Sequence, residues 1–162
     1  MKNVILALLL MFACAVCALG QTAGTQKFEE FGVTTCDEYR ARVDLLMLNL
    51  TASPGAKGYV IVYEGNVEEP VYDKKYRVVG KYLTPSAKGS AKALISYFKN
   101  HLGFRKYPTE RFVFINGGFR KKFSIEFWVV AEGSTPPPLS PTLKKIKQYI
   151  AKPITDDFCG GI

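Results

Sequence analysis

The chain of 162 residues is poor in the residue types that most often carry out catalysis or bind metal ions. It contains one histidine, His101, and beyond its first twenty residues only two cysteines, Cys36 and Cys159. A zinc site needs clustered histidine or cysteine ligands, which this set does not supply. Neither a glycine-rich phosphate loop nor a nucleophile motif is present. We therefore expect a protein that is not an enzyme and that binds no metal ion and no cofactor.

Long hydrophobic runs are also missing, except at the N-terminus. Lys2 precedes an apolar run over residues 4–17, and Ala18-Leu19-Gly20 forms a small-x-small cleavage site. A membrane-spanning helix needs about 20 apolar residues, so this run is short for that role. We predict that residues 1–20 are a signal peptide cleaved after Gly20. The mature chain would then have no transmembrane segment and would be exported, to the periplasm or out of the cell.

Acidic residues are fewer than basic ones, 14 against 22, and the formal net charge is +8. Lys2 is the only basic residue of the leader, so the mature chain would carry +7. An exported basic protein meets cell-wall carboxylates, lipid phosphates and acidic polysaccharides, and its export argues against nucleic acid as a partner. The charge therefore indicates an anionic envelope polymer as the partner, or it serves solubility alone.

The two cysteines of the mature chain predict one disulfide, between Cys36 and Cys159, as is typical of exported proteins. The bond would close a loop of more than a hundred residues. Closing such a loop contributes on the order of 4–5 kcal/mol in the chain-entropy model. The alternative is a buried Cys36 and a free Cys159 thiol in the C-terminal tail.

Two helices are expected after a polar N-terminal arm over residues 21–34. Thr35-x-x-Glu38 is a capping box, and apolar residues at helical spacing continue from it to Ser53-Pro54-Gly55. A second helix is expected from Ser90 to His101, ended by Gly103. We expect His101, near this C-terminal end, either to complement the helix dipole as a cation or simply to be exposed.

Strand patterns separate these helices. Tyr59–Tyr63 is a continuous apolar run that indicates an interior strand. Residues 66–87 leave two options open, a short strand over 75–83 or an ordered loop. Three acids close to this region are expected to be solvated surface groups: Glu64, Glu68 and Glu69.

The C-terminal part is expected to form a hairpin and a tail. Arg111–Ile115 and Phe123–Val129 are strand patterns, and Asn116-Gly117-Gly118 between them has the chemistry of a turn. A proline linker over residues 133–141 precedes a short basic helix from Ser140 to about Ala151. Residues 133–162 would thus lie outside a domain at 35–132, which we expect to be an α/β two-layer sandwich with helices on one face of a small mixed sheet.

The pattern resembles the OmpA-like peptidoglycan-binding domain. The residues that carry the resemblance are Ala91, Leu94, Tyr97-Phe98, Gly103-Phe104, Arg111-Phe112 and Ile125-Glu126-Phe127. In that family they belong to a helix ending in an apolar pair, a glycine turn and two paired strands. The family binds diaminopimelate with an aspartate after its first strand and an arginine entering its last strand. This chain has Gly65-Asn66 and Phe123-Ser124 at these positions, so the resemblance implies the fold without the ligand site as the family builds it.

A second resemblance is to a group of small exported proteins of Acidobacteria, and it implies no activity. The residues that carry it are 27–32, 41–44, 58–63, 117–120 and 126–129, before a proline-rich tail. Both resemblances agree with an exported, non-catalytic binding or structural module of the cell envelope. Its partner would be peptidoglycan, another anionic envelope polymer or an envelope protein.

The candidate ligand-binding residues are the basic residues expected at the two ends of the hairpin: Arg105, Lys106, Arg120, Lys121 and Lys122. An alternative is a secreted protein–protein interaction module that uses the tyrosine-rich segment 66–85. Trp128 with Tyr59 or Tyr63 would form an aromatic platform on the open sheet face, unless the helix expected over 143–151 covers that face.

Overall fold

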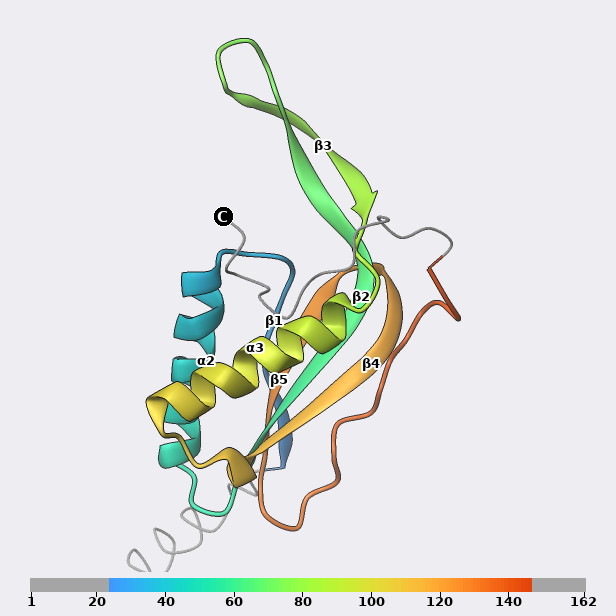
Figure 1. The fold of residues 1–162 in the computed structure, drawn as a ribbon. Coiled ribbons are helices and arrows are strands. Elements are labelled where there is room, and N and C mark those ends of the chain that lie inside the picture. The colour runs from blue at the N-terminus through green and yellow to red at the C-terminus, as the bar shows by residue number, and fades with distance from the viewer. Residues whose placement is uncertain (1–23, 147–162) are drawn as a thin grey trace, which may run out of the picture.

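The computed structural model describes residues 24–146, and the predicted signal peptide lies outside this range. Two helices cover one face of a mixed sheet of five strands (Figure 1), which confirms the predicted two-layer α/β arrangement. The elements in chain order are β1 (Thr25–Phe31), α2 (Cys36–Thr51), β2 (Lys57–Tyr72), β3 (Val78–Pro85), α3 (Ser90–Arg105), a 3-10 turn (Thr109–Arg111), β4 (Phe112–Lys122) and β5 (Ser124–Val130).

Both helices begin as their sequences predict. The Thr35 hydroxyl accepts a hydrogen bond from the Glu38 N–H at 3.3 Å, and so caps α2. Gly103 was expected to end α3 but lies within it, and the helix continues to Arg105. Lys106 ends the helix instead, in the left-handed conformation with a φ of 55°.

The core lies between the helices and the sheet. The Phe98 ring meets those of Tyr39 and Phe127 edge to face, with centroids 5.8 and 5.9 Å apart. Along β5, Ile125, Phe127 and Val129 pack toward this core, whereas Ser124, Glu126 and Trp128 lie on the opposite face. The alternation in the sequence of β5 therefore predicts its orientation correctly.

Strand β2 organises the whole sheet because it is longer than its neighbours. Its first half pairs with β5 in antiparallel fashion on one side and with β4 in parallel fashion on the other. Asn66 still lies opposite Lys122 of β4, and from Val67 to Tyr72 the strand pairs with β3 alone. Strand β1 completes the sheet beyond β5. The stretch predicted as a loose N-terminal arm therefore contains an edge strand, because residues 25–31 pair with β5.

The expected C-terminal hairpin does not form. Strands β4 and β5 follow each other in the chain but lie on opposite sides of β2. Asn116-Gly117-Gly118 lies inside β4, next to a bulge. A Cβ on Gly117 would come within 2.4 Å of the Tyr63 ring. The glycine is required for this close approach and not for a turn, which explains why the sequence pattern was misleading.

The chain passes from β4 to β5 by crossing over β2 at Gly65. The Phe123 N–H donates to the Asn66 carbonyl at 2.8 Å across this point. A Cβ on Gly65 would lie 2.3 Å from the carbonyl carbon of Lys122 and 2.4 Å from the Phe123 nitrogen. No side chain fits between the two backbones, so the crossing depends on glycine at position 65.

Beyond the crossing, β2 and β3 form a two-stranded ribbon that projects from the domain (Figure 1). We call residues 66–85 the arm. Its turn is held by Asp73, whose carboxylate accepts hydrogen bonds from the N–H groups of Lys75 at 2.7 Å and Arg77 at 3.0 Å. The segment that the sequence left undecided is therefore a hairpin with strands on both sides of the turn.

The proline-rich segment runs along the sheet without regular structure. The N–H groups of Thr142 and Leu143 donate to the Phe119 carbonyl at the edge of β4. The helix predicted from Ser140 is absent over residues 140–146, and the rest of its range lies outside the described residues. Within residues 24–146, neither helix has the length and apolar character needed to span a membrane.

Arg111 fastens the end of α2 to the start of β4. Its guanidinium donates to the carbonyls of Leu50 at 2.7 Å, Ser53 at 3.0 Å and Ala56 at 3.0 Å. We expect Arg111→Ala to lower the free energy of unfolding by about 2 kcal/mol, because these carbonyls lose charge-assisted bonds. Urea unfolding followed by circular dichroism measures this, with exposed Lys92→Ala as the control. Equal losses in both variants would contradict the role given to Arg111.

Candidate functional site

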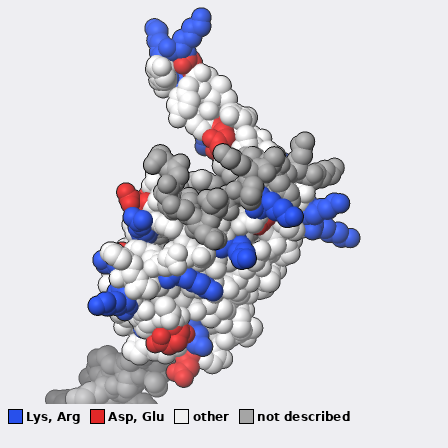
Figure 2. All heavy atoms as spheres, viewed as in Figure 1, with Lys and Arg blue, Asp and Glu red and all other residues white. Residues whose placement is uncertain are grey.

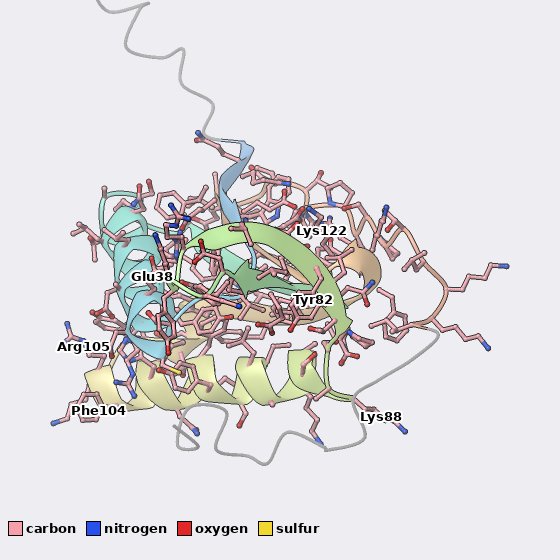
Figure 3. The ribbon with its side chains drawn as sticks, turned by 90° about the horizontal axis from the view of Figure 1, so that it is seen from above. Glu38, Tyr82, Lys88, Phe104, Arg105 and Lys122 are labelled. Carbon is pink, nitrogen blue, oxygen red and sulfur yellow. The ribbon has the colours of Figure 1, made fainter. Side chains whose placement is uncertain are left out.

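The five predicted ligand-binding residues occupy two separate places. Arg105 and Lys106 lie at the C-terminal end of α3, far from Lys122 at the end of β4 (Figure 3). Arg105 donates to the Tyr107 hydroxyl at 3.2 and 3.3 Å. The predicted set is therefore not one surface, since the hairpin that was expected to join its members is absent.

Arg120 is mostly covered and is paired within the protein, so it is not available as a contact residue. Its side chain is only 14% exposed, and its guanidinium lies 3.5 Å from the centroid of the Tyr63 ring. It donates to Glu126 at 2.9 Å, to Glu30 at 3.0 Å and to the Ser140 carbonyl at 3.1 Å. Its donors are thus already used within the protein.

Glu126 is the centre of this buried network, with a side chain that is 2% exposed. Its carboxylate accepts hydrogen bonds from Lys27 at 2.7 Å, from Arg120, and from the Trp128 indole at 3.0 Å. Burial alone would raise the pKa of Glu126. The bonds from Lys27, Arg120 and Trp128 outweigh burial and hold this pKa below its ordinary value. The carboxylate is therefore ionised and paired, which is the state of a structural ion network.

The proline-rich segment covers part of this face of the sheet. Pro137 is buried, and the Ser140 N–H donates to the Tyr63 hydroxyl at 3.2 Å. Tyr63 is fully buried and Trp128 is half-buried, with the Lys27 ammonium 5.1 Å from the centroid of the Trp128 ring. Tyr63 is therefore closed off, whereas Tyr59 lies opposite Trp128 across β2 and β5 and is half-buried like it. Over residues 140–146 an irregular segment stands where the sequence predicted the start of a helix.

Lys122 lies beside a polar pocket of about 500 Å³ at the base of the arm. It pairs with Glu68, whose other carboxylate oxygen lies 3.5 Å from the Lys81 ammonium. The hydrogen bond from Lys122 is the largest cause that lowers the pKa of Glu68. The pocket is lined by two lysines, Lys81 and Lys122, and by two carboxylates, Glu30 and Glu68. It therefore has no excess positive charge to attract an anion.

The arm exposes apolar side chains to solvent. Among residues 24–146, thirteen large apolar side chains are exposed, and seven of them lie on the arm. These seven are Val71, Tyr72, Tyr76, Val78, Val79, Tyr82 and Leu83. They need no burial to keep the domain folded, because the core forms beneath the helices. A projecting element with this composition is typical of a surface that contacts another body.

Two titratable residues have roles that differ from the prediction. His101 is buried and not exposed, and its Nε2 lies 2.8 Å from an Asp44 carboxylate oxygen on α2. Glu64 is also buried, and it accepts a hydrogen bond from the Ala91 N–H at the start of α3 at 3.3 Å. Both partners are distant in the chain, so no local pattern could identify them.

Cys36 is disulfide-bonded, and its predicted partner Cys159 lies outside the described residues. Their pairing therefore stays a prediction. Over residues 24–146, no three histidine, cysteine, aspartate or glutamate side chains are grouped so that they could hold a metal ion.

Comparison of the chain with family models, with curated proteins and with solved structures finds no match in any of the three. The assignment of a functional surface therefore rests on the geometry of this chain. That geometry distinguishes the arm, which is exposed and apolar, from the network around Glu126, which is buried and paired.

Proposed function

We propose that this protein is an exported, non-catalytic binding module of the cell envelope, and that the arm is its contact element. The observation that carries the proposal is the concentration of exposed apolar side chains on residues 71–83, on a ribbon that projects from the domain. Export follows from the signal peptide predicted over residues 1–20. The arm belongs to the tyrosine-rich segment that the sequence offered as an alternative contact surface.

Rigid support of the arm agrees with this role. Strand β2 continues without interruption from the core of the sheet into the arm, so the arm is anchored at Asn66 by the crossing strand. At the base of the arm, Lys122 and Lys81 both pair with Glu68. A contact surface held by the fold loses little conformational freedom when it binds.

We also propose that residues 35–132 are a diverged OmpA-like domain. The succession of α3, β4 and β5 along the chain supports this relation, although β4 and β5 lie on either side of β2 instead of pairing. Contact with peptidoglycan or another anionic polymer remains a second proposal. Of its predicted residues, Arg105, Lys106, Lys121 and Lys122 are exposed. This second proposal has less support because Arg120 is largely enclosed and paired, and Lys122 is paired.

A variant of the arm tests the main proposal. We expect the combined substitution Tyr72→Ser, Tyr76→Ser, Val78→Thr and Val79→Thr to reduce binding to isolated envelope at least about tenfold, because it removes the apolar contact area. Binding of residues 21–162 is measured by cosedimentation with the cell-wall and membrane fractions and by pull-down from the soluble envelope fraction. The fraction that retains the wild-type protein identifies the class of target.

Two control variants separate the surfaces. Leu45→Gln with Leu48→Gln removes exposed apolar groups from α2 and should leave binding unchanged. Lys106→Glu with Lys121→Glu reverses exposed charges outside the arm, and a loss of cell-wall binding in this variant alone would favour the polymer proposal. Undiminished binding of the arm variant to every fraction would contradict the main proposal.

A further inference from the structure

The far end of the arm combines apolar and basic groups. We propose that it binds an anionic lipid surface, with its tip seated among the headgroups. The proposal rests on the proposed function, since it names the target of the same arm. The tip of the arm is the stretch from Val71 to Val79, which contains the turn between β2 and β3.

Apolar side chains lie on both faces of the ribbon. Val71 and Tyr72 are neighbours in one strand and therefore point to opposite faces. Tyr82 lies opposite Glu69 and shares the face of Val71, whereas Val78 lies opposite Tyr72 and shares its face. A groove or a flat protein partner covers one face of a ribbon. A lipid surface surrounds an inserted tip on all sides, and this two-sided composition matches it.

Charge along the arm has a direction. The turn carries Lys74, Lys75 and Arg77, with Asp73 as its one acid, and Figure 2 shows basic side chains at the far end of the arm. The Asp73 carboxylate is occupied by Arg77 at 2.8 Å. The acids Glu68 and Glu69 lie nearer the domain. At the base, Glu68 is matched by Lys81 and Lys122, so the uncompensated basic groups lie at the tip and favour its contact with an anionic surface.

The depth of insertion follows from the backbone. Only β2 and β3 pair in the arm, so its outer edges carry N–H and carbonyl groups that need water or headgroups as partners. The tip therefore rests at the level of the headgroups and does not enter the hydrocarbon. Tyrosine is enriched at this level of membranes, and Tyr76 at the end of the turn is 89% exposed.

Vesicle cosedimentation tests the inference with the exported form, residues 21–162. We expect binding to phosphatidylcholine vesicles that contain about one third phosphatidylglycerol, and much weaker binding to phosphatidylcholine alone. Lys74→Gln with Lys75→Gln should weaken the binding about 30-fold, since each basic group near an anionic surface contributes a factor of about five. Lys106→Gln with Lys121→Gln, which removes the same charge outside the arm, should change it less than about twofold.

Failure of this inference is distinct from failure of the proposed function. No binding to anionic vesicles would overturn the lipid inference. If the arm then still mediated binding to an envelope fraction, a protein or polymer target would take the place of the lipid and the proposed function would stand. An equal loss of vesicle binding in the two double variants, Lys74→Gln with Lys75→Gln and Lys106→Gln with Lys121→Gln, would also overturn the inference. The net charge of the protein, and not the tip of the arm, would then determine binding.

Discussion

Gly65→Ala is expected to cost about 4 kcal/mol or more of the free energy of unfolding, which is a large part of the stability of a domain of this size. The added Cβ would lie 2.3 Å from the carbonyl carbon of Lys122. Both sides of this contact are backbone, so neither can rotate away as a side chain would. The whole passage from β4 to β5 would have to shift, and with it the pairing of both strands to β2.

Gly103→Ala is the matched control for this substitution. Gly103 lies in α3, and no atom comes within 4 Å of an added Cβ there. Alanine is the better helix former, so this variant should gain about 0.5–1 kcal/mol. Urea unfolding of the two variants measures both changes. Wild-type stability in Gly65→Ala would show that the chain does not cross at this point.

Glu126→Ala is expected to lower the free energy of unfolding by about 3 kcal/mol, because Arg120 and Lys27 lose the buried carboxylate between them. Glu30 also contacts both cations, but its side chain is 42% exposed. Glu30→Ala should therefore cost less than about 1 kcal/mol. Similar costs for the two variants would contradict the central place of Glu126 in the network.

The pH dependence of this difference gives an independent check. The folded protein holds the pKa of Glu126 below its ordinary value of 4.5, so unfolding at acid pH takes up a proton. The stabilisation is complete above the pKa of the unfolded chain and is lost as the pH falls through the pKa of the folded state. The stability of the wild type should therefore approach that of Glu126→Ala as the pH falls below 4.5. If the difference in stability between the wild type and Glu126→Ala stayed constant as the pH fell well below 4.5, Glu126 would act through packing alone.

Local patterns predict the helices and the interior strand well. The Thr35 cap and the stripe of Tyr39, Val43, Leu46 and Leu50 depend on neighbours within α2 and need no tertiary information. The alternation of β5 likewise reflects one covered face. In these segments the preference of the local sequence agrees with the environment that the fold provides.

Long-range contacts explain what the sequence did not reveal. Asn116-Gly117-Gly118 has the composition of a turn, but the space beside Gly117 is taken by Tyr63, which is distant in sequence. Arginine is a residue type usually found on the surface, but the Arg120 guanidinium donates to three partners that surround it: Glu30, Ser124 and Glu126. The sequence did contain a signal for the arm. In residues 71–83 the apolar residues do not alternate with polar ones, so neither face of the expected strand is marked as the one that packs on a core.

Hydrogen–deuterium exchange on native envelope tests the central claim, that the arm is the contact element, most directly. In the arm β2 and β3 pair only with each other, so the amides on its two outer edges should exchange readily in the free protein. Exchange is compared for residues 21–162 alone and after binding to isolated envelope membranes. We predict that binding protects amides of the arm, over residues 67–85, and leaves the other described residues unchanged. Protection confined to residues 105–106 and 120–122, with none on the arm, would contradict the account.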